Sequence, residues 1–224
     1  YVYGMSIINT HLLSGAKIVL NKSSVIEKDF WNKIKYHKIT TFGGVPYTYE
    51  LIHKFFLKKE NFKNIKYITQ AGGFLSDNIK LDIIKFLKKI NKKFITMYGA
   101  AEGTARLSYL PWGYAEKKNG SIGIPIYKGD FFIKDQNNKE IKEPNKEGCL
   151  FYKGKNVFLG YSHTFKDLNT KSSKKNIFNT GDIAFKDKDE FYYLKGKLTR
   201  FVKVFGNRIS LDELEKIIFK FGIK

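Results

Sequence analysis

The sequence predicts an α/β protein. A partly parallel sheet with flanking helices comes first, a β-rich region follows, and a small α+β segment begins near the carboxyl end. Three observations predict this order. In the first half, short runs rich in β-branched and aromatic residues alternate with longer segments of helical periodicity, as they do in βαβ units. Beyond about residue 120, short alternating runs are separated by turn residues, which indicates mostly antiparallel strands. The last stretch combines one strand pattern with one amphipathic helix.

Four strands and three helices are expected from residue 16 onward in the first half, which we interpret as one α/β subdomain, residues 1–119. The expected strands are the apolar runs at 16–20, 39–42, 65–69 and 94–98. The expected helices are the periodic segments at 25–37, 47–57 and 76–90. Ser76 has the short polar side chain that is typical of a helix N-cap.

The second half is expected to divide into two further parts. Residues 120–195 are interpreted as a β-rich subdomain, with strands at 130–134, 149–153, 182–185 and 191–194. Residues 196–224 are interpreted as the beginning of a small carboxyl-terminal subdomain, with a strand at 201–205 and a helix at 210–219.

The composition is that of a globular chain. The 224 residues are 42% hydrophobic, which is enough to build a sizeable core. No apolar run approaches the ~20 residues of a membrane span, so no transmembrane segment is expected. Cys149 is the single cysteine, which excludes an internal disulfide framework and favours a reducing compartment, the cytoplasm.

The formal net charge of +20 is a signal that nucleic-acid-binding proteins also carry. Nearly all of this charge is lysine spread through every segment, and arginine occurs only at positions 106, 200 and 208. Proteins that read phosphates and bases usually depend on arginine for bidentate contacts. We therefore expect no nucleic-acid partner, and a basic nucleic-acid-binding protein is the least favoured of the alternatives.

The stretch 96–104 carries the clearest chemical signal. Tyr98 ends an expected parallel strand, a glycine turn follows, and Glu102 comes four residues later. Ligands of open α/β folds bind at the carboxyl ends of such strands. An aromatic ring there can lie flat on a purine, and a carboxylate can hold a hard cation that bridges phosphates. On these residues alone, a core tyrosine beside a solvated glutamate explains the pattern equally well.

Asp182 follows Gly181 at the start of another expected strand. A carboxylate in this place can accept hydrogen bonds from the vicinal hydroxyls of a ribose. Because Gly-Asp is most often an ordinary β-turn, the functional interpretation is the minority one when this pair is taken alone.

Six glycine-containing motifs occur in a fixed order along the chain. They lie at 71–73, 98–102, 120–125, 148–161, 180–182 and 196–209. In this order the sequence resembles the adenylate-forming (AMP-binding) superfamily of acyl-CoA synthetases, amino-acid-adenylating domains and luciferases. The resemblance extends from about Tyr3 to Glu215. It implies that the sheet is an incomplete large domain of such an enzyme, and that residues 196–224 are the hinge and the beginning of its carboxyl-terminal lid.

The resemblance implies a nucleotide site with contributions from both halves of the chain. The residues expected around the nucleotide are Gly72, Gly73, Tyr98, Gly99, Ala100, Ala101, Asp182 and Lys197. Among them Asp182 matches the residue that holds the ribose hydroxyls. Glu102 matches the Mg²⁺ ligand and is expected to be catalytic. Lys197 stands where the family usually has arginine, so the charge is kept while the bidentate fork is lost.

The resemblance also implies an acyl pocket and a second half-reaction. The residues expected to line the acyl pocket are Tyr3, Gly44, Val45 and Phe74, with Tyr3 placed just before an apolar helix. Lys203 matches the catalytic lysine that turns toward the site in the second half-reaction. Thr199 and Arg200 occupy the hinge, where the family commonly has Asp or Lys in place of the threonine.

Some family features are not present in the sequence. Ala101 replaces a threonine that usually donates to a phosphate. The phosphate-binding loop belongs upstream of Tyr3, and the lysine that stabilises the developing charge belongs beyond Lys224. Losing a donor aimed at that charge typically costs about 10²–10³ in rate. We therefore expect a carboxyl-half fragment that is weakly active or inactive by itself.

The expected function is part of an ATP-dependent ligase that activates a small carboxylic acid as acyl-AMP. ATP or AMP and Mg²⁺ are the expected cofactors, and the acyl acceptor is the thiol of CoA or of the phosphopantetheine on a carrier protein. The remainder of the enzyme is a further expected partner. The alternative is a non-catalytic remnant that binds a nucleotide or nothing, which Ala101 and Thr199 favour.

Overall fold

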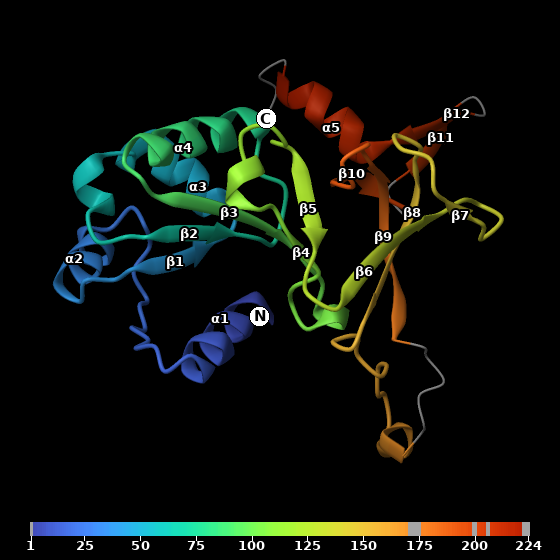
Figure 1. Ribbon diagram of the computed structural model, residues 1–224, viewed down its shortest axis with the longest axis horizontal. Coiled ribbons are helices and arrows are strands. Elements are labelled where there is room, and N and C mark those ends of the chain that lie inside the picture. Colours follow the sequence, from blue (N-terminus) through green and yellow to red (C-terminus); the bar gives the residue numbers. More distant parts are fainter. Residues whose placement is uncertain (1, 170–175, 199–200, 205–206, 221–224) are drawn as a thin grey trace. The chain divides into compact units, whose positions relative to one another are not determined.

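Parallel strands and helices alternate in the first half of the chain, and antiparallel strands follow, so the expected fold class is confirmed (Figure 1). The computed structural model describes residues 2–169, 176–198, 201–204 and 207–220. The chain forms two compact units, Tyr1–Gly123 and Ile124–Lys224. Within the described residues, no helix has both the length and the apolar character that crossing a bilayer requires.

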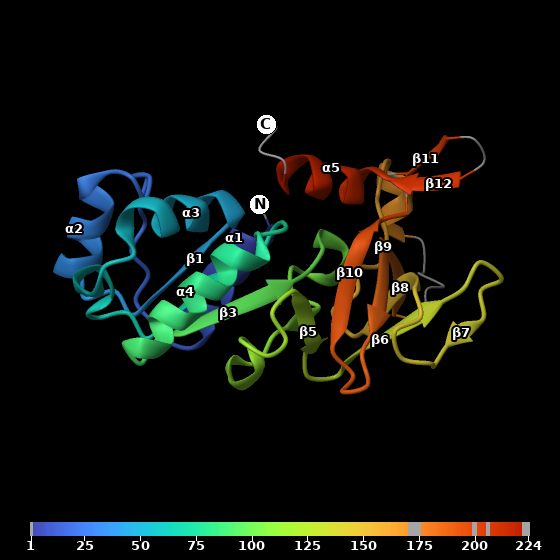
Figure 2. The same cartoon turned by 90° about the horizontal axis from the view of Figure 1, so that it is seen from above.

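The first unit is a sheet with helices on both faces. Its strands are hydrogen-bonded in the order β1-β2-β3-β4-β5, with parallel pairing from β1 to β3 and an antiparallel β4. Helices α3 and α4 cover one face and α1 lies on the other (Figures 1 and 2). The elements are α1 (Val2–Leu13), α2 (Lys28–Tyr36), β1 (Thr41–Gly44), α3 (Pro46–Leu51), β2 (Tyr67–Gln70), α4 (Asp77–Lys89), β3 (Lys93–Tyr98), β4 (Ser108–Tyr109) and β5 (Ser121–Pro125).

Helix α4 follows the sequence pattern closely. Its apolar residues Ile83, Ile84 and Leu87 are buried at helical spacing, as an amphipathic helix requires when it covers a sheet. Ser76 takes the N-cap position as expected, although its side chain makes no capping hydrogen bond. Phe94 of β3 is fully buried, and its ring makes an edge-to-face contact with the Tyr49 ring of α3 at a centroid distance of 5.0 Å.

The run at 16–20 is not a strand, and this expectation was wrong. Residues 16–20 form no secondary structure, and Leu20 is 81% exposed. An apolar run becomes a strand only when a neighbouring strand pairs with it and buries one face. The expectation that Tyr3 precedes an apolar helix was also wrong, because Tyr3 lies inside α1.

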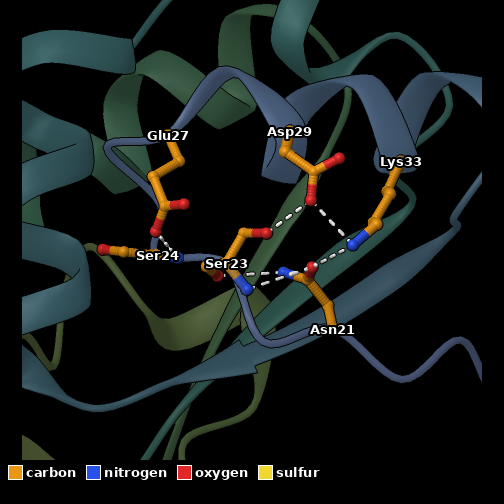
Figure 3. A network of polar contacts seen from close by, with 6 residues as sticks. All are labelled: Asn21, Ser23, Ser24, Glu27, Asp29 and Lys33. Atoms are coloured by element: carbon orange, nitrogen blue, oxygen red, sulfur yellow. Dashed lines mark hydrogen bonds and ion pairs between the residues drawn. The ribbon is translucent and has the colours of Figure 1, made fainter.

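The other two expected helices are shorter than their patterns. Helix α2 begins at Lys28 rather than at 25, because residues 25–27 turn and the Glu27 carboxylate accepts a hydrogen bond from the Ser24 amide at 2.6 Å (Figure 3). Helix α3 ends at Leu51 and continues as a π-helix, η1 (Ile52–Phe56). A short 3₁₀ turn, η2 (Lys59–Phe62), follows it.

The second unit is an antiparallel sheet with a hairpin and a helix after it. Its strands are ordered β10-β9-β8-β6-β7. Aromatic rings fill its core, and the Tyr192 hydroxyl donates to the carbonyl oxygen of Phe131 at 3.0 Å. Burial raises the pKa of Tyr192. The elements are β6 (Gly129–Lys134), β7 (Glu140–Ile141), β8 (Gly148–Gly154), β9 (Ile177–Lys186), β10 (Tyr192–Lys197), β11 (Phe201–Val204), β12 (Asn207–Ser210) and α5 (Leu211–Lys220).

Candidate nucleotide site

The carboxyl ends of β1, β2 and β3 meet at one edge of the first unit's sheet. Gly44, the last residue of β1, pairs with Gln70 of β2, and Gln70 pairs with Thr96 of β3. The turns that follow these strands hold most of the residues expected from the sequence. The structure therefore places the segments 44–45, 72–74 and 98–102 at neighbouring strand ends, where ligands of open α/β sheets bind.

The turn after β2 has a fixed shape. Gly72 has a φ of +85°, a backbone conformation that residues other than glycine rarely adopt. A Cβ added to Gly73 would lie 3.1 Å from Cγ of Pro46, so the turn passes close to the start of α3. The buried Gln70 side chain donates from Nε2 to the carbonyl oxygen of Gly73 at 3.0 Å. A backbone turn held in this way can lie against a flat ligand with no side chain in between.

The turn after β3 is tighter still. A Cβ added to Gly99 would lie 1.5 Å from the carbonyl oxygen of Ala105, so only glycine fits where the chain folds back. The Ala105 amide donates to the carbonyl of Ala100 at 3.1 Å, and the Leu107 amide donates to Tyr98 at 3.0 Å. Ala105 itself has a φ of +77°, which costs free energy for a residue with a side chain.

This fold-back carries the candidate metal ligand. Glu102 is in the middle of a 3₁₀ turn, η3 (Ala101–Gly103), and its side chain is half-buried. Ala101 is exposed and carries no hydroxyl. Within the described residues, no group of three His, Cys, Asp or Glu side chains could hold a metal ion. The Glu102 carboxylate is a hard oxygen ligand, which fits an ion that is mostly coordinated by phosphates and water.

Tyr3 attaches α1 to the middle of the sheet. Its hydroxyl donates to the carbonyl oxygen of Thr69 at 3.1 Å and lies 2.7 Å from Thr69 Oγ1. A Cβ on Gly43 would lie 2.5 Å from the Tyr3 hydroxyl, so this approach depends on the glycine. From α3, the Tyr49 hydroxyl donates to the same Thr69 carbonyl at 2.6 Å.

The chemistry of Tyr49 is dominated by its burial. The complete burial of the Tyr49 side chain raises the pKa of its phenol well above the ordinary value, and the nearby Tyr3 adds to the shift. A hydrogen bond with the backbone of Gly44 acts in the opposite direction. Tyr49 therefore stays neutral and serves as a hydrogen-bond donor.

The other expected acyl-pocket residues differ in their surroundings. Gly44 is buried, and Val45 is the half-buried N-cap residue of α3. Phe74 is 59% exposed, so its ring faces solvent for the most part. These three residues border the same strand ends as the glycine turns.

In the second unit, Asp182 and Lys197 are opposite each other on β9 and β10. The pairing of β9 with β8 is irregular near Asp182. Cys149 of β8 pairs with Ile183 and Phe151 pairs with Asn179, so an advance of two residues along β8 corresponds to four residues along β9. The Thr180 hydroxyl donates to the carbonyl of Leu150 at 2.9 Å, and Gly181 has a φ of +74°. Such a bulge redirects a side chain out of the regular alternation of the strand. The structure thus brings together two residues that are 15 positions apart in the sequence.

The remaining expected residues follow this sheet. Lys203 lies in β11 and its backbone pairs with Arg208 of β12, while its side chain is outside the described part of the structure. Thr199 and Arg200 lie outside the described residues.

Two side-chain arrangements were missed by the sequence analysis. Thr69, at a strand end, receives hydrogen bonds from Tyr3 and Tyr49, and its polar side chain at the end of an apolar run was the available signal. His53 lies 3.0 Å from a carboxylate oxygen of Asp82 on α4. They are 29 residues apart, so no local pattern indicates this pair.

Comparisons with known proteins agree with this architecture. The family model described as AMP-binding enzyme matches residues 1–162. The 4-hydroxybutyrate–CoA ligase 1 of Metallosphaera sedula is 26% identical over 216 residues, which are 93% of this chain and 37% of the relative. The long-chain-fatty-acid–CoA ligase of Bacillus subtilis is 26% identical over 223 residues, 98% of this chain and 39% of the relative. The chain thus spans less than two fifths of the length of these curated relatives.

Among solved structures, one similar fold is O-succinylbenzoate coenzyme A synthetase of Bacillus subtilis in complex with ATP and magnesium ion. Its TM-score is 0.82 at 20% identity, covering 99% of this chain and 45% of that one. The complex of the same enzyme with its acyl-adenylate intermediate also has a TM-score of 0.82. At this level of identity the likeness concerns the fold.

Proposed function

Because the chain belongs to the AMP-binding enzyme family, we propose that it is part of an ATP-dependent ligase that forms acyl-adenylates. In the proposed reaction a carboxylate oxygen attacks the α-phosphorus of ATP, and the bond to pyrophosphate breaks. The acyl group then passes to a thiol, of CoA or of a carrier protein, and AMP leaves. The fold-back from Tyr98 to Ala105 carries the proposal, because it fixes an aromatic ring and a carboxylate at one strand end.

The glycine turns are proposed to bind the nucleotide. Gly72 and Gly73 after β2, and Gly99 after β3, are exposed and have no side chain, so a ligand can reach the backbone of both turns. A ring at the end of β3 can stack on adenine. Hydrogen bonds within both turns keep their backbones in place, so little ordering is required when a nucleotide binds.

Glu102 is proposed to hold Mg²⁺. Magnesium is usually bound by one or two carboxylates together with phosphates of the substrate, and a half-buried glutamate in a fixed turn suits this role. When bound, the ion neutralises charge that develops on the phosphate oxygens. Ala101 has no hydroxyl for a phosphate, so one stabilising contact expected from the family is missing.

Asp182 and Lys197 are proposed to bind the ribose and a phosphate. The Asp182 carboxylate accepts hydrogen bonds and suits vicinal hydroxyls, whereas the lysine ammonium offers a point charge for an anion. Their cross-strand register at the β9 bulge supports a joint role.

The carboxyl-terminal part is proposed to act in the second half-reaction. We assign residues 1–119 and 120–195 to two subdomains of the large domain, and 196–224 to the hinge and the lid. Thr199 and Arg200 are the proposed hinge, and Lys203 is the proposed catalytic lysine of thiol transfer. Rotation of a lid about a few residues would let one site serve both half-reactions.

A small carboxylic acid is the proposed substrate. The proposed acyl pocket is bordered by Tyr3, Gly44, Val45 and Phe74. The Tyr3 hydroxyl is already hydrogen-bonded to Thr69, which closes the space between α1 and the sheet at this point. An acyl acceptor or the rest of the enzyme is the proposed partner, and the cytoplasm is the proposed location.

The second candidate is a remnant that binds AMP without turnover, and Ala101 is the observation that favours it. Two measurements separate the candidates: AMP affinity, and exchange of pyrophosphate into ATP with a panel of carboxylic acids, both on the full-length protein. A ligase shows both, and Glu102→Gln abolishes exchange at saturating ATP while the matched surface variant Glu60→Gln does not. Tight AMP binding with no exchange on any acid supports the remnant, and absence of both contradicts the proposed function.

A further inference from the structure

A basic surface with two apolar hollows surrounds η2 in the first unit. We call it the η2 surface. One hollow, of about 310 Å³, has Trp31, Phe55 and Phe56 along its floor. The second, of about 410 Å³, reaches Phe62 and Ile90. Residues of the segment 58–62 line both hollows, so the two hollows lie on either side of this short segment.

The floor of the first hollow is held rigidly. Trp31 donates from its indole nitrogen to the carbonyl of Val25 at 2.7 Å and stacks on Phe56 with ring centroids 5.3 Å apart. Asn61 donates from Nδ2 to the Phe56 carbonyl at 2.8 Å, which fixes the end of the π-helix. The Phe55 ring remains 50% exposed. The apolar surface is therefore preformed and accessible.

The rim of both hollows is strongly positive. Five lysines line the two hollows: Lys28, Lys58, Lys59, Lys63 and Lys92. Glu60 is the single acidic residue that lines either of them. A preformed apolar floor inside a ring of ammonium groups is complementary to an apolar side chain flanked by carboxylates.

Glu27, the N-cap residue of α2, and Asp29 in its first turn do not neutralise this rim, because both carboxylates are engaged elsewhere (Figure 3). The Asp29 carboxylate accepts from the Ser23 hydroxyl and lies 2.7 Å from the Lys33 ammonium. The Glu27 carboxylate accepts from the backbone amide of Ser24. Neither the Glu27 nor the Asp29 carboxylate therefore competes with an acidic partner for the Lys28 ammonium group.

We propose that the η2 surface docks an acidic protein segment that inserts an apolar side chain into the hollow over Trp31. Carboxylates of the segment pair with Lys28 and Lys58 on its rim. A second copy of this chain is disfavoured as the occupant, because each copy carries a formal charge of +20. A nucleic acid is disfavoured because no arginine lines the hollows, and because the Trp31 ring is packed against Phe56 and not open for base stacking.

The test uses the full-length protein and a fluorescently labelled synthetic peptide of twelve residues, rich in Asp and Glu, with one central Leu. Binding is followed by fluorescence anisotropy. We expect saturable binding that weakens as salt is raised, and a loss of affinity of about tenfold or more in the double variant Lys28→Glu, Lys58→Glu. The matched double variant Lys89→Glu, Lys117→Glu changes two exposed lysines that line neither hollow, and it keeps the wild-type affinity.

Four outcomes would overturn the proposal. One is equal loss of affinity in both double variants, which would indicate attraction to net charge alone. Another is unchanged binding when the peptide's Leu is replaced by Ser, because the hollow would then have no role. The third is tighter binding of a single-stranded RNA probe than of the peptide, with the same sensitivity to Lys28 and Lys58. Absence of any peptide binding by the folded full-length protein also contradicts the proposal, since it would mean that the surface is covered or does not recognise this chemistry.

Discussion

Replacing Gly99 with alanine tests the fold-back that carries the proposed site. The added Cβ would lie 1.5 Å from the carbonyl oxygen of Ala105, whereas real Cβ contacts under 3.0 Å are essentially never seen. The neighbour is backbone and not the end of a flexible side chain, so the chain after Glu102 must move. Gly99→Ala therefore displaces the turn itself.

The cost follows from what the displacement breaks. Overpacking in a tightly packed place costs about 1–3 kcal/mol. Moving Ala105 also strains two backbone hydrogen bonds, from Ala105 to Ala100 and from Leu107 to Tyr98, each worth about 1 kcal/mol net. We expect Gly99→Ala to lower the free energy of unfolding by about 3–5 kcal/mol, which for a chain of this size lowers Tm by roughly 6–20 °C.

The assay is urea denaturation followed by circular dichroism, with Gly113→Ala as the matched control. Gly113 has no atom within 4 Å of an added Cβ, and its variant should change the free energy of unfolding by less than about 0.5 kcal/mol. Equal stability of the two variants would refute the reasoning, because it would mean that the turn relaxes at no cost.

Three further predictions concern hydrogen bonds and charges. Tyr49→Phe removes the donor to Thr69 and should cost about 1 kcal/mol, measured by urea denaturation at pH 7. Because the pKa of Tyr49 is raised in the folded state, its stabilisation is present below the ordinary tyrosine pKa of about 10 and is lost as pH rises above it, so the wild type should lose stability in alkali more steeply than the variant. Hydrogen bonds from Lys33 and Ser23 lower the pKa of Asp29, so the contribution of Asp29 to stability is present above the ordinary aspartate pKa and is lost as pH falls. The urea midpoint of Asp29→Asn should therefore depend less steeply on pH between pH 5 and pH 3 than that of the wild type. If the proposed function holds, Asp182→Asn should weaken AMP binding by about 10- to 100-fold in calorimetric titration.

Each of these has its own control. Tyr36→Phe removes a hydroxyl from a side chain that is 83% exposed and should leave stability unchanged at all pH values. If the urea midpoint of Asp29→Asn falls with pH as steeply as that of the wild type, other carboxylates govern the loss of stability in acid. Asp130→Asn, at an exposed position of β6, should keep AMP affinity, and a loss as large as that of Asp182→Asn would point to net charge rather than to a ribose contact.

Residues whose environment is local were predicted well from the sequence. The buried stripe of α4, the N-cap position of Ser76, and the order of parallel and antiparallel strands all follow from periodicity and turn residues. The run at 16–20 was predicted wrongly, because a strand needs a partner and the sequence does not show whether one is adjacent. The π-helix after Leu51 likewise has no local signature, since its residues have the same periodicity as an ordinary helix.

The amino-acid sequence by itself determined the family, the fold class and the turns in which the candidate residues lie. It did so because glycines, strand patterns and helix caps act over a few neighbouring residues. Only the tertiary structure decided that Tyr3 and Tyr49 both donate to Thr69, that Gly99 lies against Ala105, and that the lysines around η2 surround an apolar floor. These contacts join residues through packing and strand register, and a long-range contact leaves no trace in the order of the chain until the sheet brings its ends together.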